Sequence, residues 1–234
     1  MWRSFGLLFA FGACGFHSPE ADPTGHPSSP FCDPTDPDLV ACYQFEGDPK
    51  DSSANQLDAT TVNVSFPPGK VGQAMQFAAD SAADVRDSAA FDVTAFTIEA
   101  WIWPSQLPST DTRAGLLDMN GQYGFFLRPD GDLTCTGGVT LPAAVAQLST
   151  DRWTHVACTY DGTAGTIYVD GIALSNATGG VMLKNGGTTG ISLAADNPPG
   201  SGSRFIGMID EVRLMNVART AAQICTDAGK PTCP

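Results

Sequence analysis

The residues with the clearest metal-binding chemistry lie between Glu46 and Asn55, where the chain reads EGDPKDSSAN. Carboxylate and amide oxygens are concentrated there in one tight turn that follows a strand-like run. Hard cations such as calcium bind clusters of oxygen ligands, and backbone carbonyls contribute to such clusters. The turn therefore indicates a structural calcium site. The alternative is an acidic turn held by hydrogen bonds from Asp and Asn side chains to the nearby backbone.

The acidic residues do not supply the pair that glycoside hydrolysis requires. A retaining glycosidase needs two carboxylates about 5–5.5 Å apart, one as nucleophile and one as acid/base. Asp210 and Glu211 are neighbours in a strand-like run, so we expect their side chains on opposite faces. Glu99 is alone in its own run. Nucleophile elbows, phosphate loops and a local Ser/His/Asp signature are also missing from the sequence, and we expect no enzymatic activity.

Sugar binding, a second kind of chemistry, uses aromatic side chains with polar groups at the rim of the site. In the run 96–103, Glu99, Trp101 and Trp103 alternate with apolar residues and so share one side. The candidate ligand-binding residues are Glu99, Trp101, Trp103, Tyr123 and Arg213. For each aromatic residue the alternative is packing in the core. The alternative for Glu99 and Arg213 is an ionic network with Glu211 that stabilises one sheet face.

The elements that must position these residues are short β-strands. The stretch 153–171 has two runs rich in Tyr, Thr, Val and Ile around an Asp-Gly break, which predicts a β-hairpin. Similar runs recur between turns rich in Gly, Pro, Asp and Asn, and no long amphipathic helix is evident. The predicted strands are 39–46, 59–66, 73–77, 96–103, 115–119, 123–128, 132–136, 153–160, 166–169, 189–194 and 205–215. This pattern indicates one all-β domain, a sandwich or barrel of antiparallel strands.

The beginning of the chain is similar to a bacterial export signal. The apolar run 5–13 follows Arg3 and is too short to span a bilayer. It ends in Phe-Gly-Ala-Cys at residues 11–14, which resembles the lipobox of bacterial lipoproteins, where the cysteine is acylated after cleavage. We therefore expect lipidation at Cys14; the alternative is an ordinary signal peptide cut nearby.

Cysteine number agrees with this interpretation. The chain has seven cysteines, and removal of Cys14 leaves six, an even set suited to three disulfides in an oxidising compartment. Zinc is not expected, because the six lack paired C-x-x-C spacing. The predicted pairs are Cys32–Cys42, Cys135–Cys158 and Cys225–Cys233. The main alternative joins Cys32 or Cys42 to the C-terminal tail.

Five blocks of sequence resemble, in order, the laminin-G-like, concanavalin A-like jelly-roll domains. They extend from Asp38 to Ile224 and read LVACYQFEGDPKDSSAN, VGQAMQF, FTIEAWIWP, WTHVACTYDG with IYVDG, and FIGMIDEVRLMNVART. The resemblance implies a two-sheet antiparallel jelly-roll sandwich and a structural calcium between the acidic turn and the late strand. The implied ligands are Glu46, Gly47, Asp51, Ser53, Asn55 and Asp210, with Gly47 and Ser53 contributing backbone oxygens. Glu46 and Ala54 depart from the Asp and Gly of the family pattern.

Composition divides the chain and restricts its partners. We expect a signal segment at 1–14, a Pro-rich disordered tether at 15–37, the jelly-roll domain at 38–224 and a disulfide-closed tail at 225–234. The formal net charge of −13 argues against nucleic acid as a partner and against electrostatic docking to anionic membranes. Self-repulsion at this charge favours a monomer.

By resemblance, the expected function is non-catalytic. We expect an exported carbohydrate-binding or adhesion module, displayed at the bacterial cell envelope, that binds polysaccharide or glycoprotein glycans. Membrane contact would be through an N-terminal lipid anchor only. The alternatives are a structural or assembly protein of the envelope without glycan specificity and, third, a glycan hydrolase. The step from fold to sugar binding is an analogy, because one fold serves many functions.

Overall fold

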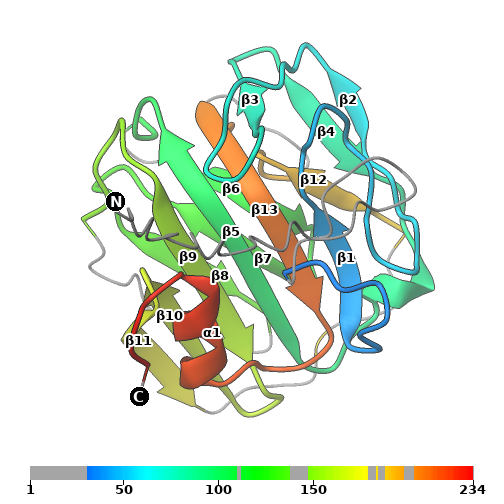
Figure 1. The fold of residues 1–234 in the computed structure, drawn as a ribbon, viewed down its shortest axis with the longest axis vertical. Coiled ribbons are helices and arrows are strands. Elements are labelled where there is room, and N and C mark those ends of the chain that lie inside the picture. The colour runs from blue at the N-terminus through cyan, green and yellow to red at the C-terminus, as the bar shows by residue number, and fades with distance from the viewer. Residues whose placement is uncertain are drawn as a thin grey trace, which may run out of the picture.

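Two antiparallel sheets lie face to face in the computed structural model, which describes residues 31–109, 112–137, 147–178, 183, 188–197 and 203–233 (Figure 1). The all-β sandwich expected from the sequence is therefore confirmed. The predicted signal segment and Cys14 lie outside the described residues. Within the described ranges, no helix is long and apolar enough to cross a membrane.

The larger sheet has seven strands, with β13 and β5 near its centre. Its order is β1 (Leu39–Tyr43), β13 (Gly207–Met215), β5 (Phe96–Pro104), β9 (Thr154–Tyr160), β10 (Ala164–Val169) and β11 (Ile172–Thr178), and β3 (Met75–Phe77) also pairs with β13. The first strand thus lies beside the last, with Tyr43 opposite Val212. This pairing brings the acidic turn after β1 close to β13.

The smaller sheet has six strands and lies behind the larger one in Figure 1. Its order is β2 (Thr60–Val62), β4 (Ala82–Val85), β12 (Ile191–Leu193), β6 (Ala114–Met119), β7 (Tyr123–Leu127) and β8 (Leu133–Thr136). A 3-10 turn, η1 (Ala89–Phe91), precedes β5. The helix α1 (Ala221–Asp227) covers part of the outer face of the larger sheet, where Ile224 packs on Ala157 and Tyr168.

The core fills the space between the sheets, and β5 shows how the sequence builds it. Phe96, Ile98, Ala100 and Ile102 are buried in the main apolar cluster, each at most 3% exposed. Full burial of one such large side chain is worth about 1.5–3 kcal/mol. The alternate residues Glu99, Trp101 and Trp103 therefore point to the outer face, as the period of two predicts.

Three disulfides are present, with the predicted pairing. Cys32–Cys42 joins the segment before β1 to that strand, and Cys225–Cys233 closes the chain after α1. Cys135 lies in β8 and Cys158 in β9, so the third bond connects the two sheets across the core. These two strands are consecutive along the chain but belong to different sheets.

Some elements differ from the expected ones for local reasons. The first strand ends at Tyr43 and not at residue 46, because Phe45 has a left-handed φ of 58° that an extended strand does not allow. The strands β4 and β11 were not expected. The latter is an exposed strand at the edge of the sheet, paired with β10, and its first residues lack the alternation of a half-buried strand.

Both ends of the described chain are more ordered than expected. Residues 31–37, placed in the tether by composition, form turns in which Asp36 N donates to Asp33 O and Thr35 N donates to Asp33 Oδ1. At the other end, α1 begins at a capping box in which the Thr220 and Gln223 side chains each accept from the other's backbone N–H. This helix was not predicted from the sequence, although T-x-x-Q is a pattern typical of a helix N-terminus.

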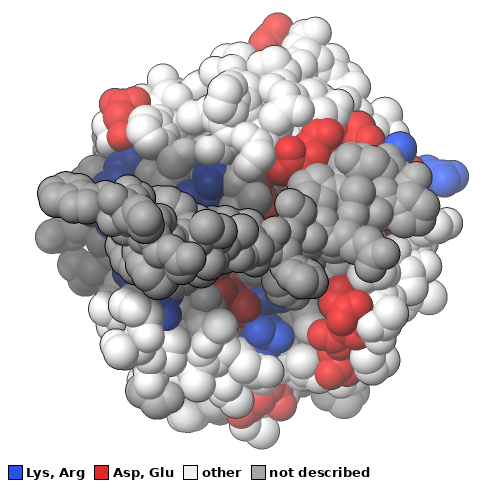
Figure 2. Space-filling view, in the orientation of Figure 1, with Lys and Arg blue, Asp and Glu red and all other residues white. Residues whose placement is uncertain are grey.

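Acidic side chains on the face shown in Figure 2 are distributed over several separate positions rather than gathered in one patch. That distribution is typical of a solvated surface and not of a docking site for one cationic partner.

Candidate functional site

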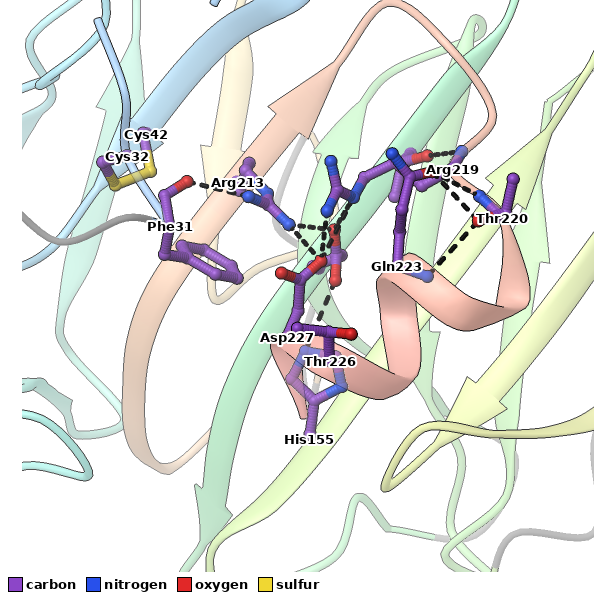
Figure 3. Close-up of polar contacts among 12 residues, drawn as sticks. Phe31, Cys32, Cys42, His155, Arg213, Arg219, Thr220, Gln223, Thr226 and Asp227 are labelled. Atoms are coloured by element: carbon purple, nitrogen blue, oxygen red, sulfur yellow. Dashed lines mark hydrogen bonds and ion pairs between the residues drawn. A yellow bond between two sulfur atoms is a disulfide. The ribbon is translucent and has the colours of Figure 1, made fainter. Parts of the chain in front are cut away.

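A buried ionic network connects the larger sheet to α1 (Figure 3). Arg213 of β13 forms ion pairs with Glu99 of β5 (Nη2–Oε1, 2.6 Å) and Asp227 of α1 (Nη2–Oδ2, 2.6 Å). Arg219 also pairs with Asp227 (Nη2–Oδ2, 2.7 Å), and His155 Nε2 lies 3.5 Å from Glu99 Oε2. Burial alone would raise the pKa of Glu99, but hydrogen bonding to His155 and the charge of Arg213 lower it overall. Glu99 is therefore an ionised group inside a closed network.

The same guanidinium holds the segment before β1. Arg213 Nη1 donates to the carbonyl oxygen of Phe31 (2.8 Å), and the guanidinium lies 3.8 Å from the centre of the Phe31 ring. Glu99 and Arg213 are 0% and 3% exposed, so neither is presented to a ligand. Glu99 and Arg213 therefore belong to an ionic network, which was the alternative to ligand binding for these two residues. Glu211, expected in the same network, lies in a separate group of carboxylates described below.

The tryptophans of β5 are half-buried on the outer face of the larger sheet. The ammonium of Lys70 lies 4.1 Å from the centre of the Trp101 ring, and the His155 ring meets Trp101 edge-on at 5.3 Å. Trp103 contacts Trp153, whose ring centre is 5.8 Å away, also edge-on. Trp101 is thus largely engaged by protein groups, whereas Trp103 and Trp153 form a partly exposed aromatic pair.

Tyr123 has a different environment from the two tryptophans. It is 1% exposed, its ring stacks on Phe96 at 5.2 Å, and its hydroxyl donates to the carbonyl oxygen of Phe91 (3.1 Å). The ring lies in the core between the sheets, which was the alternative for each aromatic candidate. The side chain thus packs inward from β7, although the residue also lines the pocket described below, and its ligand-binding role stays a prediction.

The acidic turn after β1 is held by backbone hydrogen bonds. Asp51 Oδ1 accepts from Cys42 N and Ser53 N, both at 2.8 Å, and its Oδ2 accepts from Ser53 Oγ and Leu57 N, also at 2.8 Å. The Asn55 amide donates to Val40 O (2.8 Å). The carboxylate oxygens of Asp51 are therefore already occupied. Asp51 and Asn55 thus take part in the hydrogen-bonded turn that was the alternative to calcium, and the calcium-ligand roles of Asp51, Ser53 and Asn55 stay predictions.

A second group of carboxylates lies where this turn approaches β13. Asp210 Oδ2 accepts from Lys70 N (2.8 Å) and Val71 N (2.9 Å), and Glu46 Oε2 accepts from Gln73 N (3.0 Å). The other oxygens, Glu46 Oε1, Asp210 Oδ1 and both of Glu211, are buried without a close hydrogen-bond partner, although the Gln44 side chain is near enough to Glu211 to oppose the rise of its pKa. The loop that covers them needs glycine, because a Cβ on Gly72 would lie 2.0 Å from Glu46 Oε1.

The neighbours Asp210 and Glu211 interact, contrary to the expectation from strand alternation. A β-bulge shifts the register between Asp210 and Arg213, and Glu211 has a left-handed φ of 49°. Burial raises the pKa of Asp210 to about 7, with the charge of Glu46 adding to the shift. Burial likewise raises the pKa of Glu211 to about 8, with the charges of Asp210 and Glu46 contributing. The bulge therefore brings three carboxylates into one electrostatic group.

The oxygen ligands of these three carboxylates are of the kind that a hard cation prefers, but the side chains do not converge on one point. Among the described residues, no three Asp, Glu, His or Cys side chains converge closely enough to form a metal-binding group as they stand. Four buried carboxylate oxygens without partners are nevertheless an unfavourable arrangement unless protons or a cation neutralise them. The donor set of Glu46, Asp210 and Glu211 is suited to calcium, which takes oxygen ligands in flexible geometry.

A pocket of about 220 Å³ opens on the outer face of the smaller sheet. Its floor is formed by outward-facing residues of β6, β7 and β8, and its rim by the turn between β6 and β7. The lining residues are Arg113, Asp118, Asn120, Gly121, Gln122, Tyr123, Phe126 and Thr136. Of these residues only Tyr123 was a candidate from the sequence, although the Asp that interrupts the apolar run AGLLDM was a detectable signal.

Ion pairs and hydrogen bonds within the protein hold the charged side chains of the pocket in place. Arg113 forms a two-bond pair with Asp196 (Nε–Oδ2, 3.1 Å; Nη2–Oδ1, 2.8 Å) and lies 3.8 Å above the Phe126 ring. Asp118 Oδ2 accepts from Asn197 N (2.7 Å). Burial raises the pKa of Asp118 to about 7; the neighbouring Asp196 adds to this shift, and the hydrogen bond from Asn197 opposes it.

Gln122 provides a free acceptor at the pocket. The residue is 8% exposed, and its Nε2 makes a long hydrogen bond of 3.4 Å to Asp92 Oδ1. Its Oε1 is buried and has no hydrogen-bond partner. A buried acceptor of this kind costs about 1–3 kcal/mol unless something donates to it. The pocket thus combines a small volume, fixed charges and one unsatisfied oxygen.

Comparisons with known proteins place the fold. A family model described as the concanavalin A-like lectin/glucanase superfamily matches residues 77–225. No curated protein matches the chain in sequence.

Similar solved structures share this architecture. Domain 4 of AbnA, an extracellular arabinanase from Geobacillus stearothermophilus solved with arabinotriose, superposes with a TM-score of 0.69 at 22% identity, covering 81% of this chain and 98% of that one. The binding domain of botulinum neurotoxin DC, in complex with SialylT, has a TM-score of 0.57 at 12% identity, with 83% and 51% covered. A Trypanosoma rangeli sialidase has a TM-score of 0.58 at 18% identity, and the match spans 81% of this chain but only 32% of the enzyme. At these identities the likeness is one of fold.

Proposed function

The chain belongs to the concanavalin A-like lectin/glucanase superfamily, and on that premise we propose that it is an exported, non-catalytic carbohydrate-binding module displayed at the cell envelope. The observation that carries this proposal is the pocket on the smaller sheet, whose small volume and polar lining suit part of an oligosaccharide. Two of the similar structures hold an oligosaccharide or a sialyl glycan, which supports glycans as the partner class.

The absence of catalysis is proposed from burial. Asp210 and Glu211 belong to one group of interacting carboxylates, but they are 0% and 2% exposed and covered by the loop that contains Lys70. Glu99 is 0% exposed and paired with Arg213. A glycosidic bond must reach both carboxylates of a hydrolase, and a substrate could not reach these.

Export is proposed from the cysteines. Six of the seven form three disulfides, bonds that persist in oxidising compartments such as the bacterial periplasm and the cell surface. Cys14 is the seventh, in the segment that resembles a lipobox. A lipid on Cys14 would anchor the module, and mass spectrometry of Cys14 in membrane fractions tests this step.

A structural calcium is part of the proposal. Glu46, Asp210 and Glu211 would hold it, and the ion would neutralise the buried carboxylates and fasten the loop 67–73 to β13. Asp51 and Asn55 would act indirectly, by holding the acidic turn in place.

Calcium binding is tested by thermal unfolding at pH 8. Calcium in excess of a chelator should raise the melting temperature, and magnesium should raise it less because it demands stricter octahedral geometry. Asp210→Asn should abolish the response, whereas the exposed control Asp87→Asn should retain it. A melting temperature that does not respond to calcium would remove the metal from the proposal and leave glycan binding untouched.

Glycan binding is tested with the whole exported chain on an array of bacterial and plant polysaccharides, together with an assay for reducing sugars. We expect retention on at least one glycan without release of sugar. Trp103→Ala should leave binding intact if the pocket is the site, and should abolish it if the Trp103–Trp153 pair is. Binding to no glycan would favour the structural envelope role, and sugar release would favour a hydrolase.

A further inference from the structure

The pocket on the smaller sheet has a charge pattern that restricts its ligand. Two carboxylates, Asp118 and Asp196, stand against one guanidinium, Arg113. The Arg113 Nε and Nη2 groups both donate to Asp196, and the guanidinium face covers the Phe126 ring. Arginine binds a ligand carboxylate well when its planar fork is free for two parallel hydrogen bonds. Here that fork is already occupied.

An acceptor without a donor lies beside these charges. Gln122 lines the pocket, and its Oε1 is buried and lacks a donor. Asp118 is only 5% exposed, and one of its oxygens is bound by Asn197 N. A sugar hydroxyl can donate to such an acceptor, whereas a ligand carboxylate cannot and would be repelled by the nearby carboxylates.

The volume of the pocket also favours a sugar as its ligand. Pockets for drug-sized molecules enclose about 300–1,000 Å³. The volume of about 220 Å³ here suits one sugar ring of a longer chain. The turn that forms the rim includes Gly121, where a Cβ would meet no atom within 4 Å, so the pocket is open on that side for neighbouring rings.

We propose that this pocket binds one uncharged sugar ring of an oligosaccharide, with a ring hydroxyl donating to Gln122 Oε1, and that it discriminates against sialic and uronic acids. This inference rests on the proposed glycan-binding function and names its site and ligand class. The carboxylates of Asp118 and Asp196 provide the discrimination, because they place net negative charge where an acidic sugar would carry its own.

The test compares neutral and acidic oligosaccharides by titration calorimetry of the disulfide-bonded chain at pH 8. The neutral probes are arabinotriose, galactotriose and cellotriose; the acidic probes are trigalacturonic acid and sialyllactose. We expect at least one neutral probe to bind and the acidic probes to bind at least tenfold more weakly. Because no ion pair with the ligand is formed, neutral-probe affinity should change less than twofold between 50 mM and 500 mM salt.

Two variants locate the site. Gln122→Met keeps the size of the side chain but removes its acceptor, and should weaken neutral-probe binding about tenfold. The matched control Gln106→Met, in an exposed segment, should leave it unchanged. Asp118→Asn keeps an oxygen for Asn197 N while removing a charge, so it should strengthen acidic-probe binding about threefold. Only folded protein can show stronger binding, so the result with Asp118→Asn tests the site even if Gln122→Met does not fold.

The outcomes separate this inference from the proposed function. Neutral-probe binding that Gln122→Met and Gln106→Met leave equally intact would overturn the pocket while glycan binding stands. If the acidic probes bound more tightly than the neutral ones and Asp118→Asn did not change this, the proposed discrimination against acidic sugars would be overturned, while glycan binding would stand. If no oligosaccharide or polysaccharide binds, both the inference and the proposed function fail.

Discussion

Replacement of Arg213 by methionine should reveal how much the buried network contributes to stability. Arg213 is 4% exposed at its side chain and pairs with Glu99, which is fully buried. Breaking a buried pair by removing one partner typically costs about 3–5 kcal/mol, because the remaining charge is left without compensation. Arg219 Nε still lies 3.4 Å from Glu99 Oε1, so we expect the lower end, about 3 kcal/mol. For a domain of this size that is a fall in melting temperature of roughly 6–12 °C.

Urea unfolding of a double-mutant cycle provides the measurement. Glu99→Gln in the Arg213→Met background removes the uncompensated charge and should restore at least half of the lost free energy of unfolding. The matched arginine control is Arg152→Met, which breaks an exposed pair with Asp170 and should cost less than about 1 kcal/mol. Amide exchange in 221–227 should increase in Arg213→Met, because Asp227 loses one of its two cationic partners.

Two results would refute this reasoning. One is an Arg213→Met variant no less stable than Arg152→Met. The other is a double variant that is no more stable than Arg213→Met, since the cost would then come from lost packing against Phe31 and not from a stranded carboxylate.

Three further predictions concern pH, a disulfide and the helix cap. In the presence of a chelator, the free energy of unfolding should fall as pH rises from about 4 to 8, because folded Asp210 keeps its proton up to about pH 7 whereas the unfolded chain releases it near 3.8. Burial raises the pKa of Glu211 to about 8 and that of Asp118 to about 7, so both contribute to the same slope; Asp210→Asn should therefore reduce the slope without abolishing it in urea titrations at pH 5 and 8, and a slope that the substitution leaves unchanged would contradict the role of Asp210. Replacing Cys135 and Cys158 by serine opens a link across 23 residues and should cost about 3 kcal/mol, measured against the wild type under identical non-reducing conditions; an unchanged urea midpoint would mean that the apolar core alone holds the sheets together. Thr220→Ala should cost about 1 kcal/mol through the lost helix cap, and an equal loss in the exposed non-capping control Thr163→Ala would contradict that cause.

Much of the fold followed from local patterns, because strand faces are set by a period of two. The alternation in β5 correctly assigned Glu99, Trp101 and Trp103 to one face. What covers that face depends on contacts between distant segments, here α1 and Phe31, which no local pattern contains.

The candidate metal site shows more directly what local sequence patterns cannot predict. Strand alternation separated Asp210 from Glu211, but a bulge with Glu211 at a left-handed φ brings their charges together. Bulges have weak sequence signals when the residue is not glycine. Conversely, Asp51 has the residue type of a ligand, but its oxygens are taken by backbone donors that only the folded turn supplies.

The contact between Phe31 and Arg213 fixes where the described chain begins. Phe31 meets the outer face of the larger sheet, whereas the pocket with Gln122 opens on the outer face of the smaller sheet. The described chain therefore begins on the side of the sandwich opposite the pocket, so that a ligand in the pocket and the Cys32–Cys42 entry into the fold would lie on opposite faces.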